Sequence, residues 1–211
     1  MMNRLHKYGY LIAALLALVS APLQASFSEL TPPSSSNGEW AIEAVQESDN
    51  QAYFQAFQSS QAMLNRTLGW GWPTGKLTVE GNLDTMRYYV EQRQRQRSYT
   101  YVIRDAQHRR LQGALFVNPV QRRPGVSGFR VSDFDIEVTF WLNQAGQESE
   151  ISDALIPQIT QWFRDDWGVR TVLFPISRDN HYARQQLEQA NLQFFADNSN
   201  NNEMLYRFRA R

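Results

Sequence analysis

The chain has 211 residues, 42% of them hydrophobic and 20% charged, with 21 basic and 21 acidic side chains. A chain of this length can bury the core of one domain, and its balanced charge argues against a nucleic-acid partner. The absence of cysteine excludes disulfides, thiolate metal sites and a thiol nucleophile, and three scattered histidines are too few for a metal cluster. The sequence also contains no Walker loop, dinucleotide-binding glycine motif or nucleophile elbow.

The first 25 residues have the layout of a secretory signal peptide. Arg4 and Lys7 precede an apolar run over residues 8–19, and small residues follow. Because that run is shorter than the about 20 residues that a membrane-spanning helix needs, we expect cleavage after Ala25 rather than retention as an anchor. Cleavage leaves 19 basic and 21 acidic residues, a formal charge of −2. The sequence therefore predicts a periplasmic or secreted protein with no membrane contact after cleavage, and it leaves the oligomeric state open.

The first half of the mature chain is predicted to hold a lead, a strand, helices and a hairpin. Residues 26–38 are rich in serine and proline and are expected to be disordered, so the domain occupies residues 39–211. A strand near its start is followed by two helices in which apolar residues recur at helical spacing. A hairpin over residues 99–117 comes next, and then a long loop over residues 119–132, of the kind that often borders a site.

A strand, a turn and a helix form the centre of the second half. Apolar and polar side chains alternate over residues 134–143, which predicts a strand, and residues 151–163 carry apolar side chains at helical spacing. Pro157 lies within that helical pattern, so either the helix kinks there or it begins later. The turn before the helix presents backbone N–H groups to a phosphate, although most such turns bind nothing. A buried strand over residues 169–176, a short helix and a final hairpin follow.

Several segments of the chain, taken in order, resemble those of a known family. They are Ser98-Tyr99-Thr100-Tyr101, Gly113-Ala114-Leu115-Phe116-Val117-Asn118-Pro119, Asp135-Ile136-Glu137-Val138-Thr139-Phe140-Trp141-Leu142, the pair Trp162 and Trp167, and Asn180-His181-Tyr182-Ala183. With the order of the elements, they resemble the GNAT acyltransferase superfamily over roughly residues 40–209. The resemblance implies an α/β fold in which a central mixed β-sheet is flanked by helices. It also implies acetyl transfer by direct attack of an amine, from a small molecule or a peptide, on acetyl-CoA or another acyl-CoA, without a metal.

The resemblance assigns roles to residues around the central strand and turn. Glu137 stands where many family members place the general base, and backbone amides after it would polarise the thioester carbonyl. The turn would hold the pyrophosphate, and the next helix start would complete the donor site. The implied donor-binding residues are Val138, Phe140, Asn143, Gly146, Gln147, Ser149, Asn180 and Ala183.

This sequence departs from the family pattern at both motifs. Glu148 stands where the family has glycine or alanine in the pyrophosphate turn, and Leu187 replaces the general-acid tyrosine. Tyr182 could substitute as the acid, or it could simply pack, as aromatic rings commonly do. Glu137 could serve as the base, or it could be paired with an arginine such as Arg104 or Arg130.

These departures leave a second hypothesis open, namely an exported GNAT-fold module that binds a small molecule or a protein without catalysis. The two hypotheses predict different structures. An open turn with convergent N–H groups, beside two central strands that splay apart, would favour an acyltransferase. A gap filled by side chains would favour the binding module.

Overall fold

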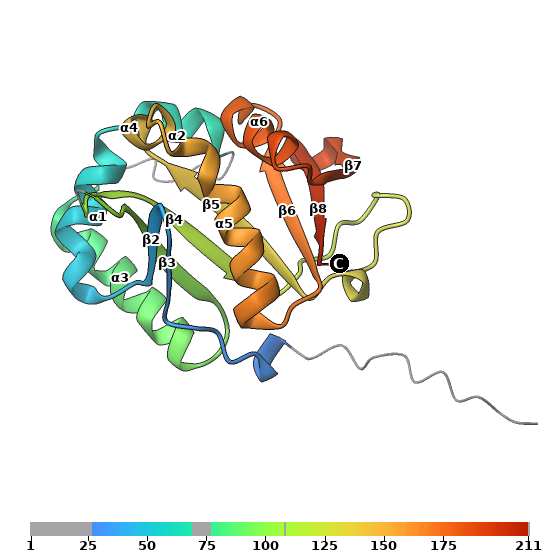
Figure 1. Cartoon of the computed structure of the whole chain (residues 1–211), viewed down its shortest axis with the longest axis horizontal. Coiled ribbons are helices and arrows are strands. Elements are labelled where there is room, and N and C mark those ends of the chain that lie inside the picture. The colour runs from blue at the N-terminus through green and yellow to red at the C-terminus, as the bar shows by residue number, and fades with distance from the viewer. Residues whose placement is uncertain (1–26, 69–76, 108, 211) are drawn as a thin grey trace, which may run out of the picture.

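A computed structural model describes residues 27–68, 77–107 and 109–210, so the predicted signal peptide lies outside the described residues. An eight-stranded mixed sheet, ordered β1-β2-β3-β4-β5-β6-β8-β7, has helices on both faces (Figure 1). The strands are β1 (Ser35–Asn37), β2 (Trp40–Ala44), β3 (Tyr99–Asp105), β4 (Leu111–Asn118), β5 (Ile136–Leu142), β6 (Thr171–Ser177), β7 (Gln193–Asn198) and β8 (Glu203–Arg209). The helices are α1 (Asn50–Gln58), α2 (Gln61–Thr67), α3 (Val79–Gln94), α4 (Gln144–Gln147), α5 (Leu155–Trp162) and α6 (His181–Gln189). Neighbouring strands are antiparallel except for β5 and β6, which are parallel.

The alternating side chains of the strands bury both faces of the sheet. On β5, Val138 and Phe140 pack on the face covered by α5 and α6, whereas Trp141 packs on the opposite face under α1, α2 and α3. A smaller cluster on this second face, centred on Leu173 and Leu205, lies under the loop over residues 119–135. This division follows from the period of two along a strand, because successive side chains point to opposite faces.

The predicted elements occur in the predicted order, with β1 and α4 as additions, and the structure adds detail to three of them. The first predicted helix is divided into α1 and α2. Pro157 lies in the first turn of α5, where the missing N–H has no carbonyl to pair with, so the helix begins later rather than kinking. After α5 a π-helical turn, Phe163–Trp167, ends at Gly168, which adopts a left-handed conformation with φ 67°.

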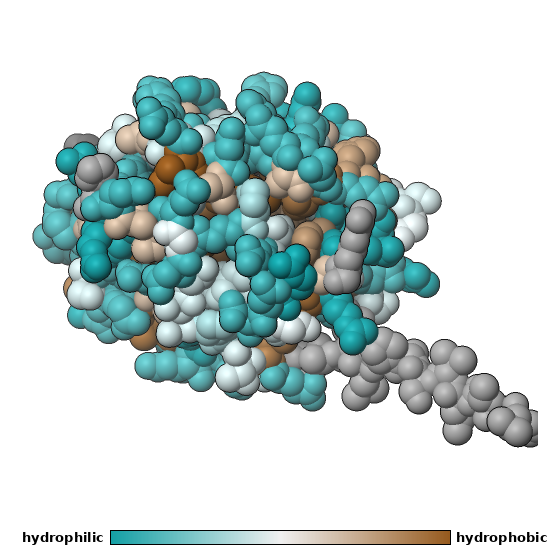
Figure 2. Space-filling model, viewed as in Figure 1, coloured by the Kyte–Doolittle hydropathy of each residue, from teal (hydrophilic) through white to brown (hydrophobic). Residues whose placement is uncertain are grey.

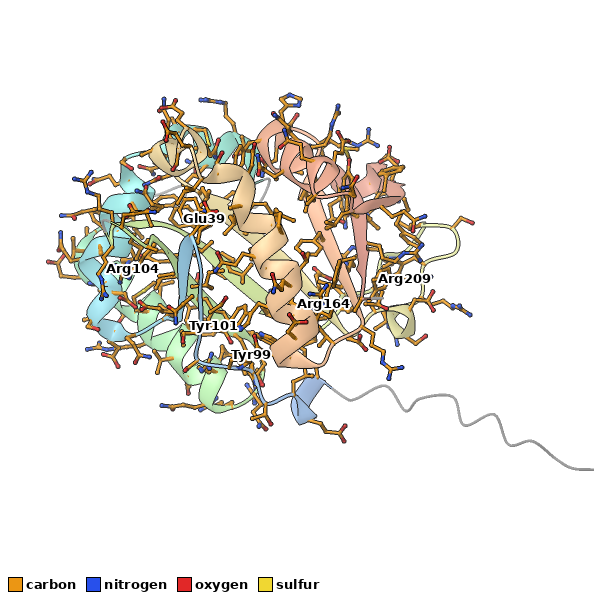
Figure 3. The ribbon with its side chains drawn as sticks, viewed as in Figure 1. Glu39, Tyr99, Tyr101, Arg104, Arg164 and Arg209 are labelled. Carbon is orange, nitrogen blue, oxygen red and sulfur yellow. The ribbon has the colours of Figure 1, made fainter. Side chains whose placement is uncertain are left out.

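The lead before the domain is ordered over residues 27–38, which corrects the expectation that residues 26–38 are disordered. Leu30 is buried, and β1 pairs with β2 at the edge of the sheet. The Tyr101 hydroxyl donates to the Pro33 carbonyl at 2.9 Å, and Tyr99 lies beside it on the same strand (Figure 3). Arg93 packs over both rings and donates to the same carbonyl. Composition alone suggested disorder, but these aromatic partners anchor the segment.

The surface in view in Figure 2 is mainly hydrophilic, and its hydrophobic residues are scattered rather than gathered into one broad patch. Among the described residues, none of the helices combines the length and apolar character needed to cross a membrane.

Candidate functional site

The parallel strands β5 and β6 are joined at one end and separate toward the other. Their paired residues are Ile136 with Val172 and Glu137 with Leu173, and no further pair between these strands is found in the part of the chain that the structure describes. Just before these paired residues, at the amino ends of both strands, the Asp135 carboxylate accepts hydrogen bonds from the backbone N–H groups of residues 170 and 171. The clamp holds the amino ends together, so the opening lies at the carboxyl ends, where open α/β sheets bind ligands.

Backbone N–H groups of β5 face this opening. The Asn143 N–H donates to the Gln112 carbonyl of β4, at 2.7 Å. Because N–H directions alternate along a strand, the N–H of Phe140 points away from β4, toward β6. Beyond Glu137 no paired residue of β6 lies opposite β5, so the Phe140 amide is directed into the opening. Val138 lies nearer the joined end, next to the last paired residue.

A cavity of about 70 Å³ lies between the separated strands. That volume can hold several water molecules, and so a small acyl or amine group. Its walls come from both strands, the end of α2, the start of α6 and the tip of the β7–β8 hairpin: Thr67, Leu68, Thr139, Phe140, Pro175, Ile176, Ser177, Asn180, Asn201 and Glu203. Thr139, Ser177 and Glu203 are among the polar residues that line the cavity.

Glu137 is buried in an ion pair beside this cavity. Its two carboxylate oxygens accept from Arg123 at 2.7 and 2.9 Å, and one of them also accepts from the Gln121 N–H at 3.0 Å. The third member is Glu203, whose carboxylate lies 3.4 Å from Arg123 Nε and accepts from Asn198. Burial lowers the pKa of Arg123, but its hydrogen bonds and charge pairing with the two glutamates raise it by more.

The partner of Glu137 therefore differs from both arginines that the sequence suggested. Arg104 pairs with Asp49 and Glu43, and Arg130 pairs with Asp133. Arg123 belongs to the long loop over residues 119–135 and is only 6% exposed, so the ion pair also holds that loop against the sheet. The three charges sum to −1, and the carboxylate that lines the cavity is Glu203 rather than Glu137.

The turn after β5 uses its N–H groups within the chain. The Asn143 side chain caps α4 by accepting from the Gly146 N–H at 2.8 Å, and Gln144 N–H donates to the Ser60 hydroxyl at 2.8 Å. Gln147 donates from its side chain to the Leu142 carbonyl, and the Ser149 hydroxyl accepts from the Ile151 N–H. The turn does not lead straight into α5, because α4 and the 3-10 turn Ser152–Ala154 come between.

Gly146 serves packing rather than the approach of a ligand. A Cβ at this position would lie 3.2 Å from both the Gln112 and Leu142 Cβ atoms, so a larger residue would require α4 and its neighbours to move apart by a few tenths of an ångström. The turn thus supplies no convergent N–H groups, and it does not fit a diphosphate.

At the start of α6, Asn180 is the helix cap and lines the cavity. Its side-chain oxygen accepts from the Ala183 N–H at 3.0 Å, which explains the spacing of these two residues. Tyr182 is half-buried beside the core on the α5 face, and burial together with the charge of Asp153 raises the pKa of its hydroxyl. Leu187, at the position of the family's acid tyrosine, is fully buried in that core.

The separated strands, the sheet order and the flanking helices define the class of the fold, which is that of the GNAT N-acetyltransferases. Three solved structures illustrate the likeness. RimL, a ribosomal α-N-protein acetyltransferase in complex with coenzyme A, has a TM-score of 0.64 and 14% identity, over 86% of this chain and 98% of its own. The ribosomal-protein-alanine acetyltransferase of Vibrio fischeri has a TM-score of 0.62 and 14% identity, over 83% and 96%. The microcin self-immunity acetyltransferase MccE, in complex with acetyl-CoA and AMP, has a TM-score of 0.60 and 12% identity, over 82% and 94%.

No protein-family model matches the sequence, and no curated protein matches it either. The likeness therefore establishes the fold, and the chemistry has to be argued from the residues of this chain.

Sequence reasoning missed two members of the site, Arg123 and Glu203. The only signal for Arg123 was its place in a long loop with two adjacent arginines. Glu203 lies in the final predicted hairpin, at the start of β8, and nothing in its neighbours along the chain indicates a cavity.

Proposed function

We propose that this protein is an N-acyltransferase that moves an acyl group from a thioester donor to an amine. The observation that carries the proposal is the opening between β5 and β6, with the Phe140 N–H directed into it and a polar cavity beside it. The solved neighbours RimL and MccE were crystallised with coenzyme A and acetyl-CoA, which supports a thioester of the acyl-CoA class as the donor.

The reaction is direct attack of the amine nitrogen on the thioester carbon. A C–N bond forms, the C–S bond breaks, and the sulfur leaves as a thiolate. An acceptor that binds as an ammonium ion gives up one proton to become the nucleophile and a second after the attack, which the thiolate can take. The Phe140 N–H is placed to donate to the carbonyl oxygen as negative charge develops on it. A thiol has a pKa of about 8.5, so the thiolate leaves readily and a strong general acid is not required. The loss of the family tyrosine at Leu187 is therefore compatible with turnover.

Glu203 is the residue we propose to bind the amine and receive its proton. Its carboxylate lines the cavity, whereas both oxygens of Glu137 are occupied by Arg123. The net negative charge of this group of three favours a cationic acceptor, such as a primary amine or a peptide N-terminus. Glu137, first assigned as the base from its family position, is proposed to hold Arg123 and the loop in place instead.

The test is acyl transfer by the full chain, measured as thiol release and as mass increase of the acceptor. Acetyl-CoA and a short acetyl thioester are the donors, and a panel of primary amines and peptides with free N-termini supplies the acceptors. We expect acceptor-dependent thiol release. If no donor is turned over while an amine or peptide still binds, the binding module becomes the better explanation.

We also propose that the protein works outside the cytoplasm, on the basis of the signal-peptide layout of residues 1–25. Fractionation of the native host and mass spectrometry of the protein test this proposal. A protein that begins after Ala25 in an exported fraction is expected, and a cytoplasmic protein that retains its first residues would contradict it.

A further inference from the structure

We propose that the donor is recognised through its acyl and thiol end alone. A thioester of pantetheine, or of a shorter thiol, should then be accepted as readily as acetyl-CoA. This inference rests on the proposed acyltransferase function and narrows its donor class. It follows from a contrast within the site. The cavity between β5 and β6 can hold the acyl and thiol end of a donor, whereas the turn after β5 offers few free N–H groups and no positive charge to a diphosphate.

The backbone N–H groups beyond β5 are already hydrogen-bonded within the chain. Eight of the ten N–H groups between Asn143 and Ser152 donate to protein oxygens. Three of these donations involve side chains that fill the turn: the Asn143 carboxamide, the Ser60 hydroxyl and the Ser149 hydroxyl. A diphosphate would have to break these bonds to gain its own, so the net benefit of binding there is small.

The charge of this segment opposes a diphosphate as well. Residues 143–153 contain Glu148, Glu150 and Asp153 and no lysine or arginine, and both glutamates are exposed. Arg110 faces the same surface hollow as Glu150, but Asp105 lines that hollow too, so its charge is offset. Arg66, on the short helix α2, lines a different surface hollow, which it shares with Gln144 of α4. Like charges at this range are unfavourable, and salt screens them.

The two helices that flank the opening are tied together near the carboxyl ends of the strands. Gln186 of α6, a buried side chain, donates to the Asp153 carboxylate just before α5 at 2.7 Å. Tyr182 of α6 lies close to the same carboxylate. This contact joins α6 to the segment just before α5, and the two helices are neighbours in the ribbon drawing (Figure 1). A pantetheine arm is narrower than a nucleotide and needs less of the space between these two helices.

The experiment compares kcat/KM for acetyl-CoA, acetyl-pantetheine and S-acetyl-N-acetylcysteamine, with the full chain and one amine acceptor. We expect acetyl-CoA and acetyl-pantetheine to agree within about threefold, because no hydrogen bond to the diphosphate is gained or lost, and each such charge-assisted bond is worth about tenfold or more. A preference for acetyl-CoA of about a hundredfold, equivalent to two such bonds, would overturn the inference and leave the acyltransferase function intact. Absence of turnover with all three donors would overturn both.

A charge variant gives a second, independent readout. The double variant Glu148→Gln and Glu150→Gln removes the repulsion, so the ratio of acetyl-CoA to acetyl-pantetheine kcat/KM should rise by about twofold to fivefold at low ionic strength and fall back in salt. Glu91→Gln, on the exposed face of α3, is the matched control and should leave the ratio unchanged. An unchanged ratio in the double variant would contradict the electrostatic part of the inference.

Discussion

The proposed site has two ends, both built by β5: the cavity between β5 and β6, which we call the cavity end, and the turn that follows β5. The two ends differ in how well they could bind a ligand. Along β5 the separation from β6 and its cavity are present, whereas the turn immediately after β5 is filled by its own hydrogen bonds. The separation is a property of the whole sheet, set by the Asp135 clamp and by the pairing of β6 with β8. An anion site depends on a few side chains that leave N–H groups free. The same fold can therefore keep the opening between the two strands and still lack a binding site for the diphosphate of a donor.

The largest expected effect concerns the cavity end. Arg123→Leu leaves Glu137 buried without its partner, so the free energy of unfolding should fall by about 3–5 kcal/mol. Urea denaturation measures it, with the exposed neighbour Arg122→Leu as the control, expected to change stability by less than about 0.5 kcal/mol. Arg123→Met combined with Glu137→Met should recover much of the loss. A stable Arg123→Leu protein would show that the pair contributes nothing to the fold.

The second effect separates the two glutamates of the cavity end. Glu203→Gln should lower kcat by about a hundredfold while the midpoint of unfolding changes little, because Glu203 is partly exposed. Glu137→Gln should instead lower stability, since it weakens a buried ion pair. The measurements are steady-state turnover and thermal unfolding of both variants. The opposite pattern, with turnover lost only in a fully stable Glu137→Gln protein, would restore Glu137 as the base.

The third effect tests the turn. Asn143→Ala removes the cap of α4 and should cost about 1 kcal/mol of stability, with KM unchanged for every donor. Gln144→Ala, at the adjacent exposed position, is the control. A rise in KM for acetyl-CoA but not for acetyl-pantetheine would show that Asn143 binds the nucleotide part of the donor, which would weaken the contrast between the two ends.

The effect that is smallest at neutral pH lies at the contact between α5 and α6. Burial and the Asp153 charge raise the pKa of Tyr182 above its ordinary value of 10.0. Its neutral form therefore contributes stability that is complete below pH 10 and is lost as pH rises, because the unfolded chain ionises first, by up to about 1.4 kcal/mol per pH unit. Tyr182→Phe should make the decline of stability above pH 10 shallower and leave kcat near neutral pH unchanged. Tyr88→Phe, an exposed position, is the control, and a large drop in kcat would make Tyr182 a general acid.

Much of the fold could be predicted because its information is local. The alternation along β5 and the apolar spacing of α5 follow from burial on one face, and Gly168 marks a helix end by its conformational freedom. Asn191 likewise takes the left-handed turn that a glycine would take, with φ 58°. Such features need no knowledge of distant residues.

The site could be predicted only in part, because its decisive contacts join distant segments. Ser60 accepts the Gln144 N–H across 84 positions of the chain, and Arg123 meets Glu203 across 80. Neither pairing leaves a pattern in the local sequence. The ordered lead is a similar case, since its Ser/Pro composition is that of a linker, and it is held by distant partners that include the aromatic rings of β3 and the strand β2.

The ordered lead also bears on the proposed cleavage after Ala25. Phe27 packs against Tyr99, and it stands two residues after Ala25, the expected cleavage position. Proteolysis is favoured in exposed, unpacked segments, whereas in the folded protein Leu30 is buried in the core and Phe27 packs against it. Processing would then have to precede folding, and precursor that folded first would keep its leader and resist the peptidase.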